Sequence, residues 1–86
     1  MDRPGAAFRA AAEAAQAGAG IIAARHRGDL ANADALLEGI DDKHKAAGFL
    51  LLADLVVALL AQAEGRTVDE VTAEVSLQIA AQVSSS

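Results

Sequence analysis

Few residues in this sequence could do chemistry, and they are scattered along it. The two histidines, His26 and His44, fall on different predicted helices, and neither takes part in a His-x-x-x-His or Glu-x-x-His spacing. A zinc site needs three or four ligands, and the chain has no Cys to supply them. Ser76 has no histidine close by in sequence to act as its base. We therefore expect a protein that is not an enzyme and that holds no metal or cofactor.

Asp54 is the residue with the most specific chemical hypothesis, because it interrupts the almost wholly apolar run from Ala46 to Ala63. A carboxylate buried in such a helix could bind a small ligand in an apolar pocket. The alternative is that Asp54 lies on a narrow exposed strip of the helix, or pairs with an arginine across an interface. We favour this alternative because a lone carboxylate without a second acid or base makes a poor active site.

Glycines and capping residues divide the chain into four predicted helices. Gly28, Gly39 and Gly65 mark the helix ends, and the apolar Ile40 after Gly39 is typical of a Schellman C-cap. Asp29 is a good N-cap, and Thr67 with Glu70 forms a capping box. The predicted helices are Pro4–His26, Leu30–Glu38, a third that begins after Asp41 or Asp42 and reaches Glu64, and a fourth from Thr67 to about Val83.

Short connections and an Ala-rich composition with few aromatics favour an all-α fold. We expect residues 1–86 to form a single helical domain, with residues 84–86 as a frayed tail. Its four helices would form two α-hairpins packed around the central apolar third helix. In the fourth helix we expect burial of an apolar stripe: Val68, Val71, Val75, Ile79 and Val83.

The third helix is apolar around most of its circumference, and three short partners in one chain of 86 residues are too few to cover it. The first helix offers a face of small residues that another helix can approach closely. These features predict a homodimer. The expected interface comprises Phe8, Ala15, Ile22, Phe49, Leu52, Leu55, Val56, Leu59, Leu60 and Leu77.

The formal net charge of −5 disfavours non-specific binding to nucleic acid or to an anionic membrane. The charge is uneven, however, and a regulator that touches nucleic acid through Arg3, Arg9, Arg25 and Arg27 is the alternative function. The apolar run is short for a membrane span and has Asp54 near its middle, so we expect no membrane partner. The first residues lack the pattern of a signal peptide, so we expect a cytoplasmic protein.

Three segments resemble small Ala-rich proteins of actinobacteria and their phages. They are Ala23–Asp29, Phe49–Leu55 and Val75–Ala80, which read as a helix end, a buried helix and a closing helix. The resemblance implies a bacterial or phage origin and carries over no activity and no site residues. Together these observations predict a non-enzymatic interaction module that binds itself and an unidentified protein, such as a phage-encoded modulator acting in the host cytoplasm.

Overall fold

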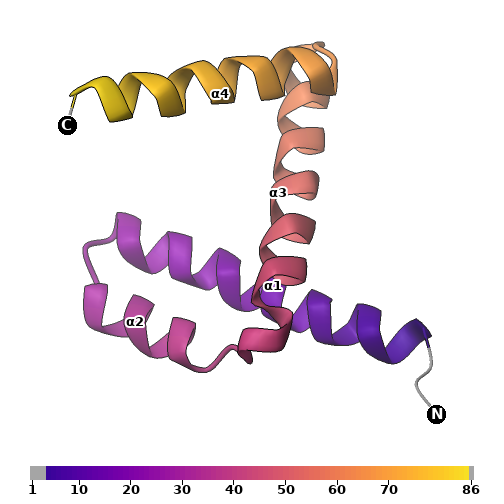
Figure 1. The fold of residues 1–86 in the computed structure, drawn as a ribbon, viewed down its shortest axis with the longest axis vertical. Helices are drawn as coiled ribbons and strands as arrows, with labels where there is room; N and C mark the ends of the chain where they lie inside the picture. Colours follow the sequence, from indigo (N-terminus) through magenta and orange to yellow (C-terminus); the bar gives the residue numbers. More distant parts are fainter. Residues whose placement is uncertain (1–3, 86) are drawn as a thin grey trace. The chain divides into compact units, whose positions relative to one another are not determined.

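The computed structural model describes residues 4–85. These residues form four helices in the expected order (Figure 1). No strand occurs in this part of the chain, so the all-α, four-helix prediction is confirmed. The helices are α1 (Pro4–His26), α2 (Leu30–Glu38), α3 (Asp42–Glu64) and α4 (Val68–Ser85).

Two helices end at a glycine with left-handed backbone, as the sequence predicts. Gly28 has φ of 80° and Gly65 has φ of 65°, a conformation that costs glycine little because it lacks Cβ. After α1, the N–H of Asp29 donates to the carbonyl of Ala24 at 2.9 Å, the long hydrogen bond of a Schellman motif. After α3, the N–H of Arg66 donates to the carbonyl of Ala61 at 2.9 Å in the same way. Both helix ends are therefore determined by residues close by in sequence.

The end of α2 is different, and the expected Schellman cap there is wrong. Gly39 has φ of −75° and remains right-handed. Its N–H donates to the carbonyls of Ala35 and Leu36, both at 3.2 Å, and the chain then passes through Ile40 into the next helix. Ile40 is buried in the core of the α1–α2 hairpin, so its apolar contact is tertiary.

The helix starts follow the capping residues. The Asp29 carboxylate accepts from the N–H of Asn32 at 3.2 Å. Ahead of α4, the N–H of Thr67 donates to the Glu70 carboxylate at 2.9 Å, and the N–H of Glu70 donates to the Thr67 hydroxyl at 3.1 Å. This is the predicted capping box.

α4 continues two residues past its predicted end at Val83. Ser84 and Ser85 are helical, and the Ser85 hydroxyl donates to the carbonyl of Ala81 at 2.9 Å. The predicted frayed tail is therefore helical over these two serines, and Ser86 lies outside the described residues.

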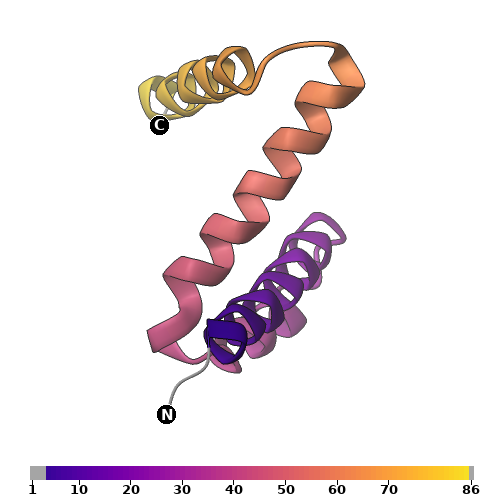
Figure 2. The same cartoon turned by 90° about the vertical axis from the view of Figure 1, so that its right-hand side faces the viewer.

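The single domain expected over residues 1–86 stays a prediction, and two compact units can be distinguished within the chain. Unit 1 extends to Ala53 and contains α1, α2 and the first half of α3. Unit 2 begins at Asp54 and contains the second half of α3 and α4. The boundary falls inside α3, which is continuous (Figure 2).

The core of unit 1 is built on α1 and α2, which lie side by side as a hairpin (Figures 1 and 2). It consists of small and β-branched residues, namely Ala14, Ile21, Ala24, Ala33 and Ile40, with Ala17, Leu36 and Phe49 packed against them. α3 contributes only Phe49 to this cluster. The expected packing of the other helices around α3 stays a prediction. Of the residues of α3, Gly48 and Ala61 are buried.

α1 and α3 cross closely within unit 1 because both carry glycine at the contact. A Cβ built on Gly48 would overlap the Cβ of Ala14, and one built on Gly18 would lie 2.9 Å from the Phe49 ring. Large side chains of α3 thus fill the space above the small face of α1, as the sequence indicates.

In unit 2 the buried residues are Ala61 and Val71. The other members of the expected buried stripe of α4, namely Val68, Val75, Ile79 and Val83, are exposed, so that prediction is wrong. Arg66 holds the junction between α3 and α4. Its guanidinium contacts Glu64 at 3.0 Å and Glu74 at 2.9 Å, and these carboxylates raise its pKa.

Candidate functional site

The polar candidates from the sequence do not converge. Asp54, His26 and Ser76 are all exposed, and they stand on three different helices. Among residues 4–85, no group of three or more His, Asp or Glu side chains could hold a metal ion. The structure therefore brings together no catalytic or metal-binding set from these residues.

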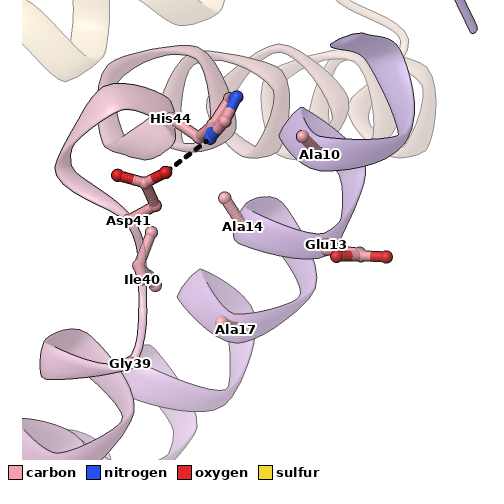
Figure 3. A pocket seen from close by; sticks show the side chains of 8 residues that line it. All are labelled: Ala10, Glu13, Ala14, Ala17, Gly39, Ile40, Asp41 and His44. Carbon is pink, nitrogen blue, oxygen red and sulfur yellow. Dashed lines mark ion pairs between the residues drawn. The ribbon is translucent and has the colours of Figure 1, made fainter. Parts of the chain in front are cut away.

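Both histidines lie beside pockets: His26 lines one with Ile22, Arg25 and Leu30, and His44 lines another. The His44 pocket has a volume of about 340 Å³ and lies between the middle of α1 and the start of α3 (Figure 3). The His44 Nδ1 lies 3.4 Å from the Asp41 carboxylate, and the two side chains point toward each other while Glu13 points away from them. The rest of the lining is apolar or backbone, namely Ala10, Ala14, Ala17, Gly39 and Ile40.

The Asp41 carboxylate already has a structural role. One of its oxygens accepts from the N–H of Lys43 at 3.1 Å, and its carbonyl accepts from the N–H of His44 at 2.9 Å. Asp41 is therefore the N-cap of α3. Glu13 also lines the pocket but points away from the pair, and the lining contains no nucleophile, so the His44–Asp41 pair stabilises the start of α3.

The arginines of the alternative nucleic-acid surface are not gathered on one patch. Arg9, Arg25 and Arg27 are exposed, but Arg9 and Arg25 lie about 24 Å apart along α1 at 1.5 Å per residue. Arg3 lies outside the described residues. Arg25 and Arg27 remain as a local basic group at the end of α1.

Apolar surface is the main feature of the candidate site. We define the α3 patch as Leu55, Val56, Leu59 and Leu60, all of which are at least two-fifths exposed. Leu55 and Leu59 are one turn apart, and so are Val56 and Leu60, so the two pairs form one continuous surface. Asp54 lies on the side of the helix away from Val56 and Leu59, because successive residues turn by about 100°.

A second apolar surface lies in unit 1. A groove of about 550 Å³ runs between α1 and α2 beside Phe49. Its lining is mostly apolar, with one charged residue from each of the two helices, and comprises Ile21, Ile22, Arg25, Leu30, Ala33, Asp34, Leu37 and Phe49. The spacing of Leu30, Ala33 and Leu37 marks them as one face of α2, but nothing in the sequence shows that Leu30 and Leu37 are left exposed.

The structure divides the expected interface residues into two groups. Ala15 is buried inside unit 1, and Phe49 and Leu52 are half-buried against α1, so these three already have partners within the chain. The others are exposed, namely Phe8, Ile22, the α3 patch and Leu77. Only the α3 patch brings several of them together.

No protein-family model, curated protein or solved structure matches the chain. The resemblance to Ala-rich proteins of actinobacteria and phages therefore stays a prediction.

α3 is also long and apolar enough to cross a membrane, and little of its most apolar segment is buried. The core helix of a soluble protein can have the same length and composition, but it is mostly buried. The exposed apolar surface of α3 is one that another protein surface or lipid could cover.

Proposed function

We propose that this chain is a non-enzymatic association module, and that a second copy of it covers the apolar surface of unit 2. The observation that supports this is the imbalance within unit 2. It buries one large apolar side chain, Val71, and exposes nine, four in the α3 patch and five in α4. The five in α4 are Val68, Val75, Leu77, Ile79 and Val83.

Size makes this imbalance significant. A unit of fewer than about 40 residues needs a disulfide, a metal or association to stay folded. Unit 2 runs from Asp54 to Ser86 in a chain without Cys, and its described residues form no metal-binding group. Association is the route that its exposed side chains support.

A two-fold pairing of α3 patches is the simplest arrangement, because the same surface then serves both copies. The exposed fractions of the four patch residues add up to about two whole side chains. Burying them would contribute about 3–6 kcal/mol per copy. For the pair this is about 6–12 kcal/mol, and association costs about 4–15 kcal/mol, so the two patches leave little surplus and further contacts would strengthen the dimer. Asp54, on the far side of α3, would stay in water.

Two leucines of α3 give a matched test. Leu59 is 65% exposed in the patch, and Leu50 is 64% exposed nine residues earlier, on the opposite side of the helix. We expect light scattering to give twice the chain mass of 8.7 kDa for the natural sequence and for Leu50→Asp. Leu59→Asp should give the mass of one chain. The proposal is contradicted if the natural sequence stays monomeric at about 100 μM. Such a result would mean a Kd of about 1 mM or weaker, too weak for a functional dimer.

Membrane insertion of α3 is the second candidate, favoured by the length and apolar character of this exposed helix. Asp54 opposes it, because it lies near the helix midpoint and a carboxylate at the bilayer centre costs about 2.5–3.5 kcal/mol. The same two variants separate the candidates. A spanning helix would lose vesicle binding with either Leu50→Asp or Leu59→Asp, whereas dimerisation depends on Leu59 alone. Binding to a different protein partner stays a prediction from the sequence.

A further inference from the structure

The groove of unit 1 has the dimensions and lining of a site for one face of a helix. Arg25 and Leu30 lie at one end of it, next to the connection between α1 and α2, and Ile21 and Leu37 lie further along. From Leu30 to Leu37 the groove follows α2 for about 10 Å, or two helical turns. An amphipathic helix binds such a groove through side chains one turn apart.

α4 carries a stripe of that kind. Val75, Ile79 and Val83 follow one another at intervals of one turn, and all three are exposed. The charged groups of α4 are segregated along its length as well. Asp69, Glu70 and Glu74 occupy its first half, no basic residue occurs in it, and no charged residue follows Glu74.

Charge selects the groove as the site for α4 and sets the direction of the helix. The charged residues of α4 are all acidic, so pairing α4 with another α4 would bring like charges together. At the Arg25 end of the groove, Arg25 and Arg27 outnumber Asp29. An α4 whose acidic first half lies at this end runs parallel to α2, and its uncharged second half then passes Asp34.

We infer that the groove of unit 1 binds α4 of a second copy, so that each dimer contains two such contacts. This inference rests on the proposed self-association and names the surfaces that add to the α3 patch. Val75 and Ile79 would fill the apolar part of the groove, and Asp69 would approach Arg25. The α3 patch alone is marginal for a stable dimer, and these contacts provide the remainder.

The test uses the full chain and exposed positions, so that each variant keeps its fold, which circular dichroism checks. Ile22→Asp alters the groove and Ile79→Asp alters the stripe. We expect each to weaken the dimer at least tenfold by analytical ultracentrifugation. The matched control is Ala81→Asp on the other side of α4, because Ala81 is exposed and is not one of the apolar side chains that the second copy is proposed to cover. This control should change the dissociation constant less than twofold.

Mixing the two variants tests whether the contact joins groove to helix. A heterodimer of Ile22→Asp with Ile79→Asp keeps one intact contact, because the natural groove of one chain meets the natural α4 of the other. We expect the mixture to associate more tightly than either variant alone. Charge gives an independent check. Arg25→Glu should weaken the dimer, and adding Asp69→Arg in the same chain should restore it.

The outcomes separate this inference from the proposal that it rests on. A monomeric natural sequence overturns both. If the natural sequence dimerises and Leu59→Asp dissociates it, but Ile22→Asp has no effect, the groove is not the site of α4. If Ile79→Asp alone weakens the dimer, α4 binds another surface of the second copy and the groove assignment is wrong.

Discussion

Replacing Gly48 with alanine tests the close crossing of α1 and α3 that positions unit 1. The new Cβ would overlap the Ala14 Cβ and would lie 3.0 Å from the Ala14 carbonyl carbon and 3.1 Å from the Ala15 nitrogen. Backbone atoms cannot give way as the end of a side chain can, so the two helices must separate. Overpacking of this kind costs about 1–3 kcal/mol, and a backbone clash belongs at the upper end. Alanine regains about 1 kcal/mol of helix propensity.

The expected result for Gly48→Ala is therefore a net loss of about 2 kcal/mol, or about 8–16 °C in Tm. Gly20→Ala is the matched control, since its Cβ meets only a Leu36 methyl group at an ordinary 3.4 Å. It should be up to about 1 kcal/mol more stable than the natural sequence. Thermal and urea denaturation followed by circular dichroism, at one protein concentration, measures both. A Gly48→Ala protein that melts at or above the natural sequence would refute the close crossing.

Three further expectations concern the start of α4. Thr67→Ala removes the hydroxyl cap and should lower the free energy of unfolding by about 1 kcal/mol in a urea titration. The pKa of Glu70 lies below its ordinary value because the Thr67 N–H donates to the ionised carboxylate. This stabilisation is thus present above pH 4.5 and is lost as the pH falls through the lowered pKa. Glu70→Gln should flatten the pH dependence of Tm in that acidic range, and an unchanged profile would contradict the assignment. Arg66→Ala removes the contacts to Glu64 and Glu74 and should speed hydrogen exchange in the first turns of α4. High salt should reproduce part of that effect in the natural protein.

The helix ends could be predicted because each is encoded by a few neighbouring residues. Gly28 and Gly65 supply a left-handed backbone, and Thr67 and Glu70 satisfy each other's N–H groups, whatever the rest of the chain does. Gly39 shows the limit of this reasoning. The same residue type ends α2 in a right-handed conformation, because the burial of Ile40 sets the path of the chain.

The packing of α3 could not be predicted, because a helix that is apolar on nearly every side gives no periodic signal for its buried face. In unit 1 the buried face of α3 is the one that carries Gly48, because its lack of a side chain lets α3 approach Ala14 closely. Hydrophobicity alone therefore pointed to a central α3 and to a buried stripe in α4. The small residues that decide the contact contribute almost nothing to a hydrophobic pattern.

The sequence predicted the whole α3 patch of the candidate site, but only Ile22 and Phe49 of the groove. Leu55, Val56, Leu59 and Leu60 were expected at the surface because the chain is too short to cover them. The groove was not expected, since Leu30 and Leu37 read as ordinary core positions of α2. Their exposure depends on the angle between α1 and α2, which no local spacing reports.

The single large buried side chain of unit 2 has a consequence for the lifetime of the protein. With only Val71 fully enclosed, opening of unit 2 in a lone chain costs little free energy, and a protease reaches its backbone easily. If a second copy covers unit 2 as proposed, it raises that cost by mass action. Degradation would then slow as the protein accumulates, so that the half-life of the chain depends on its own concentration.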